Sequence, residues 1–420
     1  MWDKLIKRYV CTASYEAAIQ ALHGLQSNSN YLKLITKDNS QTSVCKLYNT
    51  KKYLIRSGIT LEKLDSLSVI HIAGTKGKGS TCAYTEAILR EHGFKTGFFS
   101  SPHLVNVRER IRISGQPISK MQFTQNFWKI YKKLEDARKY ESDMPTYFKF
   151  LTILMFNIFL DEHVDVAIIE VGIGGLYDCT NIVRNPVCVG ITSLGLDHTS
   201  LLGNTIEDIA YQKSGIFKSK TVAFSVPQFS QAMRILEKRA IESNFQQQNA
   251  SIAIQLATEW LLTRNKAATV SMDKIAIALT SCRWPGRMQI LRSSVGDFFL
   301  DGAHTIESIE CCISWFNDVS SGSKEKKLLI FNTSGIKSLD NEMNSSPIDE
   351  QRIQCVINSK IWGMNSVVAN NVFEVLEDIK KNLEYKDNCE RYQILVTGSL
   401  HLIGAVLAIL DPNLTMNTEF

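Results

Sequence analysis

A glycine-rich segment with two lysines is the part of the chain best suited to bind a charged ligand. It reads Gly-Thr-Lys-Gly-Lys-Gly-Ser over residues 74–80, after the apolar run Val69–Ala73 and before the predicted helix Cys82–His92. Glycine lets the backbone approach an anion closely, because it has no Cβ. A helix N-terminus offers unpaired N–H groups and a partial positive charge to phosphate. We therefore expect ATP phosphates to be bound by Lys76, Gly77, Lys78, Gly79 and Ser80.

This loop departs from the common Walker pattern, which would require glycine at position 72, where Ile72 stands. A glycine-rich turn without a ligand is the alternative interpretation. The strand pattern before the loop and the helix pattern after it are the context that a phosphate loop requires, so they favour nucleotide binding.

Polar side chains also follow three other predicted strands. Ser100, Glu170 and His198 each stand at or just after the end of such a strand. Ligands of parallel sheets bind beyond the carboxyl ends of the strands, so we expect these residues to lie near the phosphate loop. Mg²⁺ prefers oxygen ligands, and Glu170 is the best candidate, because a carboxylate ending an apolar strand is costly unless paired or metal-bound. The alternatives are a buried salt bridge for Glu170, a structural histidine for His198 and a capping serine for Ser100.

Three further residues are ambiguous by themselves. Lys213 lies on a predicted helix and, taken alone, is typical of a surface residue. Asp301 follows another predicted strand and could hold a ribose hydroxyl or an adenine amino group. Arg287, in the Trp-Pro-Gly-Arg segment 284–287, is placed to reach a phosphate. A turn residue and a surface charge are the alternatives for Asp301 and Arg287.

The elements that must position these residues alternate between strands and helices. Residues 1 to about 65 have helical patterns, and the apolar runs that follow predict strands at Val69–Ala73, Thr96–Phe99, Val164–Val171, Val187–Thr192 and Thr221–Val226. Helices are predicted between them at Cys82–His92, Thr124–Tyr140, Tyr147–Leu160, Thr205–Lys213 and Ser230–Ser243. This alternation predicts an α/β fold with a doubly wound, mainly parallel sheet.

A second, smaller α/β unit is predicted after the Trp-Pro-Gly-Arg segment. Its strands are expected at Asp297–Leu300, Lys327–Asn332, Gln354–Ile357, Ser366–Ala369 and Gln393–Thr397. We therefore divide the chain into residues 1–283, which would bind ATP, and residues 284–420, a C-terminal domain.

Composition is that of a globular protein rather than a nucleic-acid-binding or membrane protein. Apolar residues make up 44% and charged residues 21%, and Lys and Arg exceed Asp and Glu by only 47 − 42 = 5. Phe150–Leu160 is the longest apolar run and is too short to span a bilayer, so a core helix is expected. The ten cysteines show no zinc spacing and favour reduced thiols. We expect a cytoplasmic monomer, with a mitochondrial form left open.

Several ordered motifs resemble folylpolyglutamate synthase, and most closely its eukaryotic branch. Besides the loop 74–80, they are Gly-Phe-Phe-Ser-Ser-Pro-His-Leu (97–104), Arg-Glu-Arg-Ile-Arg-Ile (108–113), Glu-Val-Gly-Ile-Gly-Gly (170–175), Leu-Asp-His-Thr-Ser-Leu-Leu-Gly (196–203), Trp-Pro-Gly-Arg (284–287), Asp-Gly-Ala-His (301–304) and Val-Thr-Gly-Ser-Leu-His-Leu (396–402). The family belongs to the Mur-ligase-like ATP-dependent amide ligases. The resemblance implies a P-loop-type central domain of Mur-ligase type followed by a Rossmann-like domain.

The resemblance also implies a reaction in one-carbon metabolism. ATP would phosphorylate the carboxylate of a folate, and the amine of L-glutamate would attack the resulting acyl phosphate, so that the γ-linked glutamate chain grows. Folate and L-glutamate would be the substrates, with ATP, Mg²⁺ and K⁺ as cofactors. Such chemistry depends mostly on positioning and charge neutralisation.

Roles at the site follow from the same resemblance, residue by residue. Mg²⁺ would be held by Ser100, Glu170, His198 and Lys213, the last matching a lysine that the family often carbamylates. Asn249, Arg287 and Asp301 would join the phosphate loop in binding ATP. Catalytic roles are implied for Lys78, Lys213 and His304.

Two segments depart from the family pattern. Residues 244–250 keep the Gln and Asn of a Gly-x-His-Gln-x-x-Asn-Ala motif but lack its Gly and His, and residues 331–337 lack a Gly-Asp-Arg-Asp continuation. The departures motivate one alternative, the non-catalytic shortened form, and three other functions are considered in all. They are dihydrofolate synthase activity on the same scaffold, a non-catalytic shortened form that binds folate or ATP, and a generic nucleotide-binding regulator.

Overall fold

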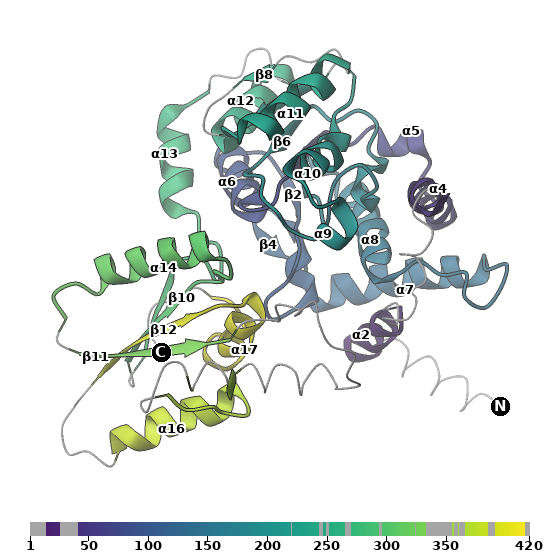
Figure 1. Cartoon of the computed structure of the whole chain (residues 1–420). Helices are drawn as coiled ribbons and strands as arrows, with labels where there is room; N and C mark the ends of the chain where they lie inside the picture. Colours follow the sequence, from purple (N-terminus) through teal and green to yellow (C-terminus); the bar gives the residue numbers. More distant parts are fainter. Residues whose placement is uncertain are drawn as a thin grey trace, which may run out of the picture. The chain divides into compact units, whose positions relative to one another are not determined.

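The computed structural model divides the chain into two compact units. The first comprises the described residues of Met1–Pro102 and Arg108–Cys282, and the second those of His103–Val107 and Arg283–Phe420. The structure describes residues 14–25, 41–219, 221–242, 247–248, 252–264, 270–293, 296–323, 325–332, 355–356, 360, 366–384 and 391–415 (Figure 1). The excursion of residues 103–107 into the second unit was not expected. The assignment of functions to residues 1–283 and 284–420 stays a prediction.

A mainly parallel sheet forms the centre of the first unit. Its order in the described residues is β4-β3-β2-β5-β1-β6-β7-β8, and only the β2–β3 and β3–β4 pairs are antiparallel. The strands are β1 (Val69–Ala73), β2 (Thr96–Phe99), β3 (Ile111–Ile113), β4 (Gln116–Pro117), β5 (Val166–Glu170), β6 (Cys188–Ile191), β7 (Val222–Ser225) and β8 (Gln247–Gln248). The predicted α/β class with a mainly parallel sheet is confirmed, whereas the short antiparallel edge was not predicted.

Helices cover both faces of this sheet (Figure 1). Gly97 is level with Val69 of β1, and Gly190 is level with Ile72. Successive side chains of a strand point to opposite faces, so these two positions, three residues apart, lie on opposite faces of the sheet. A Cβ at Gly97 would meet Phe159 of α8 (Tyr147–Asp161), and a Cβ at Gly190 would meet α12 (Ile252–Arg264). The other helices of this unit are α2 (Tyr15–Gly24), α4 (Gln41–Ser57), α5 (Leu61–Leu64), α6 (Lys78–Glu91), α7 (Lys120–Asp136), α9 (Thr199–Leu202), α10 (Ile206–Lys213), α11 (Ser230–Glu242), α13 (Met272–Ser281) and the 3₁₀ helices η1 (Val107–Arg110), η2 (Cys179–Ile182) and η3 (Ser214–Ile216).

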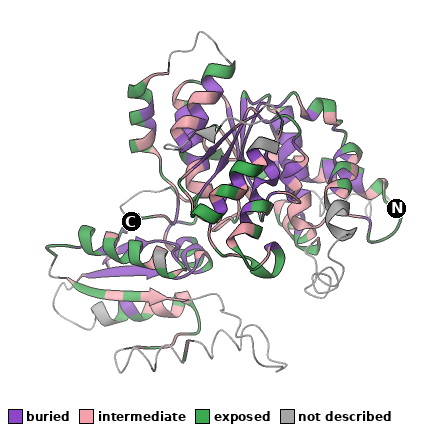
Figure 2. Cartoon of the chain, turned by 45° about the horizontal axis from the view of Figure 1, so that its top comes forward, coloured by how far each residue is buried: buried purple, intermediate pink, exposed green. Residues whose placement is uncertain are grey.

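Burial follows the pattern expected for a sheet covered on both sides. All residues of β1, β2, β5 and β6 are buried, and Figure 2 shows the central strands in the colour of buried residues while the helices have exposed outer faces. Helix α8 is buried from Phe150 to Leu160, so the prediction of a core helix is confirmed. Among the described residues, no helix combines the length and apolarity needed to cross a membrane.

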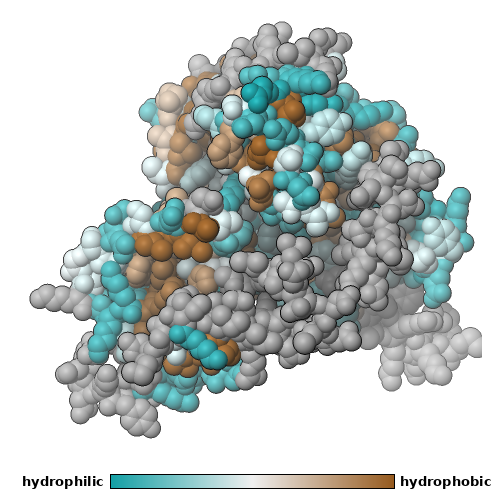
Figure 3. Space-filling view, viewed as in Figure 1, coloured by the Kyte–Doolittle hydropathy of each residue, from teal (hydrophilic) through white to brown (hydrophobic). Residues whose placement is uncertain are grey.

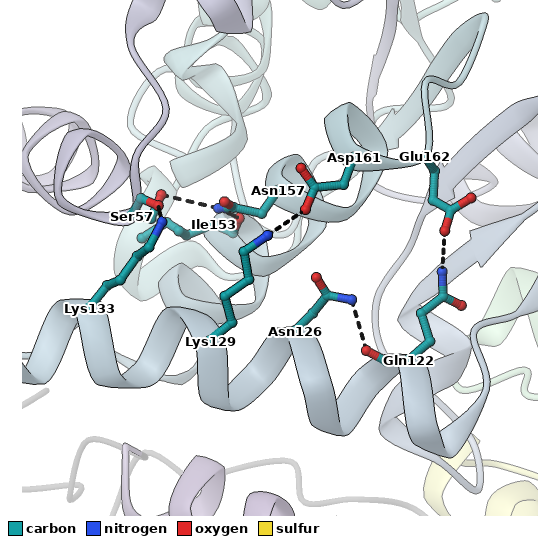
Figure 4. Close-up of polar contacts among 9 residues, drawn as sticks. All are labelled: Ser57, Gln122, Asn126, Lys129, Lys133, Ile153, Asn157, Asp161 and Glu162. Carbon is teal, nitrogen blue, oxygen red and sulfur yellow. Dashed lines mark hydrogen bonds and ion pairs between the residues drawn. The ribbon is translucent and has the colours of Figure 1, made fainter.

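Polar contacts fix α8 against α7 and the end of α4 (Figure 4). Lys129 pairs with Asp161 at 2.8 Å, and Gln122 Nε2 donates to Glu162 Oε1 at 2.7 Å. Asn157, on the buried side of α8, donates to the hydroxyl of Ser57 at 3.1 Å. These contacts set the position of α8, whose N-terminus lies at the edge of the sheet where β5 ends.

The second unit contains a four-stranded sheet of order β11-β12-β10-β9 in the described residues, with β9 antiparallel. Its elements are β9 (Gln289–Arg292), β10 (Gly296–Leu300), β11 (Lys326–Phe331), β12 (Tyr392–Thr397), α14 (Ile306–Val319), α16 (Val372–Glu384) and α17 (Leu400–Leu410). Figure 3 shows apolar side chains at the surface of this unit near the position of α14, where Ile306, Ile313 and Val319 are exposed.

Two predicted strands of the second unit are wrong. Residues 355–356 are helical, while the ends of the predicted strand 354–357 lie outside the described residues. Residues 366–369 form no strand, although Val367 and Val368 have high β-propensity. Val367 is 89% exposed, so it gains neither burial nor a pairing partner there. Propensity without a neighbouring strand does not make a sheet.

A buried histidine in β1 makes the stability of this fold dependent on pH. His71 is fully buried, and its Nε2 lies 2.8 Å from the hydroxyl of Thr180. Burial, together with the charge of Lys218, lowers the pKa of His71 from 6.5 to about 3. Below pH 6.5, His71 therefore binds a proton in the unfolded chain but not in the folded chain. Stability is lost as the pH falls from 6.5 towards 3.

We predict that His71→Gln removes the part of the pH dependence of stability that His71 causes. The free-energy difference between wild type and variant, measured by denaturant unfolding, should shrink by about 1.4 kcal/mol per pH unit below pH 6. Other titrating groups are common to both proteins and cancel in the difference. A difference that stays constant between pH 7 and pH 5 would contradict the account.

Candidate functional site

Four loops meet at one edge of the first sheet, because their strands run parallel and end together. Ile72 pairs with Glu170, and Phe99 with Ile169, so Ser100 follows at the level of Glu170. Ala73 pairs with Ile191, which brings the segment after β6 beside the glycine-rich loop. The structure thus places the loop 74–80, Ser100, Glu170 and the segment 192–198 at the same edge, as the sequence predicted.

The glycine-rich loop is held by the segment that follows β6. The backbone N–H groups of Thr75 and Lys76 donate to the carbonyl oxygen of Ser193 at 2.9 and 3.2 Å. The hydroxyl of Thr75 donates to the carbonyl oxygen of Gly195 at 3.0 Å and accepts from its N–H at 3.1 Å. This reciprocal pair fixes the loop before any ligand arrives.

Two glycines of the loop are required by geometry. A Cβ on Gly74, whose φ is +153°, would stand 1.8 Å from Oγ1 of Thr192. Gly77 is left-handed, with φ +81°, and is the N-cap of α6, where no side chain caps the helix. The first N–H groups of α6 therefore have no side-chain cap, which is the arrangement that binds phosphate at a helix N-terminus. Gly79 and Ser80 lie in this first turn.

Two lysines lie against the loop. Nζ of Lys78 donates to the carbonyl oxygen of Thr75 at 3.3 Å, and Nζ of Lys213 donates to that of Gly74 at 2.7 Å. Lys213 is only 3% exposed, so the interpretation of a surface lysine is wrong. Burial, assisted by the charge of Lys78, lowers the pKa of Lys213 to about 7, against the opposing effect of Asp197 and Asp178. A large share of this amine is therefore neutral near pH 7, and a neutral amine is a nucleophile.

Glu170 is a buried carboxylate at the end of an otherwise apolar strand. It is 4% exposed, and its Oε2 accepts a hydrogen bond from the N–H of Ser101 at 3.0 Å. Ser100 is equally buried. These oxygen donors fit Mg²⁺, which keeps several waters and needs few protein ligands beside the phosphates. Within the described residues, no three His, Cys, Asp or Glu side chains are grouped as a metal site.

His198 stands at the same edge, and its side chain lies near Asp197. Its Nε2 lies 3.6 Å from Asp197 Oδ2, and its side chain is 47% exposed. Its backbone is left-handed, with φ +49°, at the N-cap of α9. The structure thus brings His198 to the edge, where its side chain lies near Asp197.

In the second unit, three predicted residues gather where β10 ends. The two carboxylate oxygens of Asp301 accept the backbone N–H groups of Met288 and Ala303 at 3.0 and 2.9 Å. A Cβ on Gly302 would lie 3.1 Å from the guanidinium of Arg287. Nδ1 of His304 lies 2.9 Å from the carbonyl oxygen of Gly302 and must be its protonated nitrogen, so Nε2 is the basic nitrogen of the neutral ring. Asn249 lies outside the described residues.

Sequence reasoning missed Thr75, Thr192 and Asp178. Asp178 accepts from the N–H of Ile173 at 3.1 Å and from the N–H and hydroxyl of Thr180, and so holds the loop after β5. Burial raises the pKa of Asp178. An acid within the otherwise apolar and glycine-rich segment 171–179 is the signal that could have identified it.

Comparisons with known proteins agree on one family. Residues 72–257 match the family described as Mur ligase middle domain. A protein named folylpolyglutamate synthase, mitochondrial, from Bos taurus is 44% identical over 376 residues, which cover 76% of this chain and 64% of that protein. A putative folylpolyglutamate synthase from Caenorhabditis elegans is 36% identical, with 94% of this chain and 92% of that protein covered. The chain thus matches less than two thirds of the mammalian relatives' length.

Solved structures share the fold. The S73A mutant of L. casei FPGS has a TM-score of 0.74 at 21% identity and covers 95% of this chain and 100% of that chain. A structure described as an FPGS-AMPPCP-folate complex has a TM-score of 0.72 at 21% identity, with the same coverage.

The two loop glycines provide a matched test of the loop geometry. Gly74→Ala forces a Cβ into Thr192 and should destabilise the protein by about 3 kcal/mol. Gly77→Ala meets nothing closer than 3.9 Å and bears only the left-handed backbone penalty, about 1 kcal/mol. Denaturant unfolding of both variants measures the difference. Equal losses for the two would show that the contact between the loop and Thr192 is absent.

Proposed function

The chain belongs to the folylpolyglutamate synthase family, and from this premise we propose that it is an ATP-dependent ligase adding L-glutamate to folates through γ-linked amide bonds. The observation that carries the proposal is the uncapped start of α6, which stands at the same edge as the buried Glu170 and as Lys213, whose pKa burial lowers to about 7. Such a group of residues suits the transfer of a phosphoryl group from ATP.

Phosphoryl transfer comes first. An oxygen of the folate carboxylate attacks the terminal phosphorus of ATP, the bond to ADP breaks, and an acyl phosphate forms. The loop N–H groups and Lys78 hold the phosphates and neutralise their charge. Ser100 and Glu170 would hold Mg²⁺, with His198 as a further ligand, and the ion would offset charge on the phosphate oxygens.

Amide formation follows in the second step. The glutamate amine attacks the acyl carbonyl carbon, the tetrahedral intermediate expels phosphate, and the amine loses a proton. We assign the proton to Nε2 of His304, which is the basic nitrogen because Nδ1 donates to Gly302. Arg287 and Asp301 are further proposed contacts of ATP. Both oxygens of Asp301 already organise a turn, but each keeps a second lone pair.

Lys213 suits a further modification. Carbon dioxide adds to a neutral amine, a nitrogen–carbon bond forms and a proton leaves, so that a cation becomes an anion. The pKa of about 7 supplies the neutral amine at physiological pH, and the resulting carboxylate could join the metal ligands.

Asn249 remains a proposed ATP contact by resemblance alone, and K⁺ a proposed cofactor. We keep a monomer and the cytoplasm as expectations, with a mitochondrial form open because the mammalian relatives are named mitochondrial.

Release of ADP tests the function and separates it from dihydrofolate synthase activity. Purified protein should release ADP over many turnovers only when Mg²⁺, glutamate and tetrahydrofolate are all present, because without glutamate the reaction stops at the acyl phosphate. Dihydropteroate in place of tetrahydrofolate should give little release. Preference for dihydropteroate would favour dihydrofolate synthase activity, and ATP binding without release would favour a non-catalytic form.

Glu170→Gln should reduce turnover by at least about a thousandfold, because the amide loses the charge that a metal requires while keeping its shape. Circular dichroism and thermal unfolding should stay near those of the wild type. Turnover within a few-fold of the wild type would contradict the assignment of Glu170 to the metal.

Lys213→Ala should likewise lose most activity, and short carboxylates such as acetate should restore part of it by replacing the carbamate. Mass spectrometry after chemical trapping of the carbamate should find it on Lys213 in the wild type. A fully active Lys213→Ala variant would refute the proposal that a carbamate on Lys213 is needed for activity.

A further inference from the structure

Gln228 connects the end of β7 to the segment that follows β6. Its Oε1 accepts a hydrogen bond from the N–H of Leu194 at 3.0 Å, and its Nε2 donates to the carbonyl oxygen of Thr192 at 3.0 Å. The N–H of Leu194 needs an acceptor and the carbonyl of Thr192 needs a donor, so the orientation of the amide is fixed. One side chain therefore satisfies a donor and an acceptor of the same short segment.

Backbone pairing between β6 and β7 ends just before this contact. Ile191 pairs with Ser225, and the N–H of Val226 donates to the carbonyl oxygen of Ile191 at 3.2 Å. The next carbonyl along the chain is that of Thr192, which Gln228 reaches with its side chain. Nε2 of Gln228 also donates to the hydroxyl of Ser225 at 3.2 Å, which holds the amide from the side of β7. Gln228 thus continues the connection between the two strands beyond their ends.

The segment that Gln228 holds is the one that holds the phosphate loop. Ser193 lies between the two residues that Gln228 contacts, and its carbonyl oxygen accepts the N–H groups of Thr75 and Lys76. Gly195 exchanges two hydrogen bonds with the hydroxyl of Thr75. The loop is therefore bonded to the segment 192–195, and that segment is bonded to Gln228.

Burial makes the bonds of Gln228 difficult to replace. Thr192 is 3% exposed and Leu194 is 4% exposed, so water has little access to their backbone groups. A buried N–H or carbonyl group without a partner is costly. If the amide were removed, we would expect the segment to shift until these groups found new partners. The loop would then have to be ordered when its ligand binds, and ordering on binding lowers affinity.

We propose that Gln228 is a positioning residue for the nucleotide, which acts through the backbone of residues 192–195 on the shape of the phosphate loop; this inference rests on the proposed function. The alternative is that Gln228 only stabilises the fold before α11. The two differ in whether the loop and its ligand are affected or only the stability of the whole unit.

Two measurements on Gln228→Leu separate these roles, because leucine removes the amide at similar size. In the ligand-free protein, the amides of Thr75 and Lys76 should exchange with deuterium at least about tenfold faster than in the wild type, since local opening becomes easier. Exchange within β12 of the second unit should stay unchanged. The affinity for AMPPCP with Mg²⁺, measured by titration calorimetry, should fall by about tenfold.

Gln231 provides the matched control on the same part of the chain. It is exposed on α11, and its Oε1 accepts from the hydroxyl of Ser230 at 3.2 Å. Gln231→Leu removes the same amide without touching the segment after β6. It should match the wild type in both measurements.

The other outcomes contradict one claim or the other. If Gln228→Leu binds AMPPCP like the wild type, or if Thr75 and Lys76 exchange at the wild-type rate, the role of Gln228 is overturned and the proposed function stands. Faster exchange throughout the first unit with unchanged affinity also overturns it, in favour of a purely structural role. A folded wild type that does not bind AMPPCP contradicts the proposed function, and the exchange rates alone then decide whether Gln228 holds the loop.

A second variant keeps the test decisive if Gln228→Leu does not fold. Gln228→Glu keeps the acceptor for the N–H of Leu194 but places a carboxylate oxygen against the carbonyl of Thr192. It should weaken the binding of AMPPCP with Mg²⁺ by about threefold or more. Undiminished affinity would overturn the proposal.

Discussion

The parallel register of β2, β5, β1 and β6 is the constraint on which the site depends. Residues separated by about a hundred positions along the chain meet because these strands end at one edge. The register is tight at one point, where Gly74 passes Thr192 with no room for a Cβ. The glycine-rich loop therefore has its shape before a ligand binds, and the hydrogen bond from Lys213 to Gly74 connects α10 to that shape.

The same edge collects groups that are unfavourable to bury. Glu170, Asp178 and Lys213 are all nearly inaccessible to water. Burial raises the pKa of Asp178 and lowers the pKa of Lys213, and both changes favour the neutral form of the side chain. Asp178 is stabilised by backbone donors. In the proposed function, Mg²⁺ would offset the charge of Glu170, and carbon dioxide would react with the neutral amine of Lys213. Stability given up at this edge is what makes the groups reactive.

Much of the first unit could be predicted from its sequence, and much less of the second. The strands at 69–73 and 96–99 have the predicted bounds, since apolar runs between glycine-rich turns leave few alternatives. The strands expected at 354–357 and 366–369 failed, because β-propensity does not say whether a partner strand is available. At the site, polar residues after strands were readable, but the burial of Lys213 and the restraint by Thr192 depend on tertiary register. No local pattern encodes that register.

Mass spectrometry of the folate product is the most direct test of the central claim. Purified protein would be incubated with ATP, Mg²⁺, tetrahydrofolate and isotopically labelled glutamate. The account predicts products that are heavier by one or more γ-linked glutamates and that disappear when ATP is omitted. A folded protein that binds ATP and leaves tetrahydrofolate unchanged would contradict it.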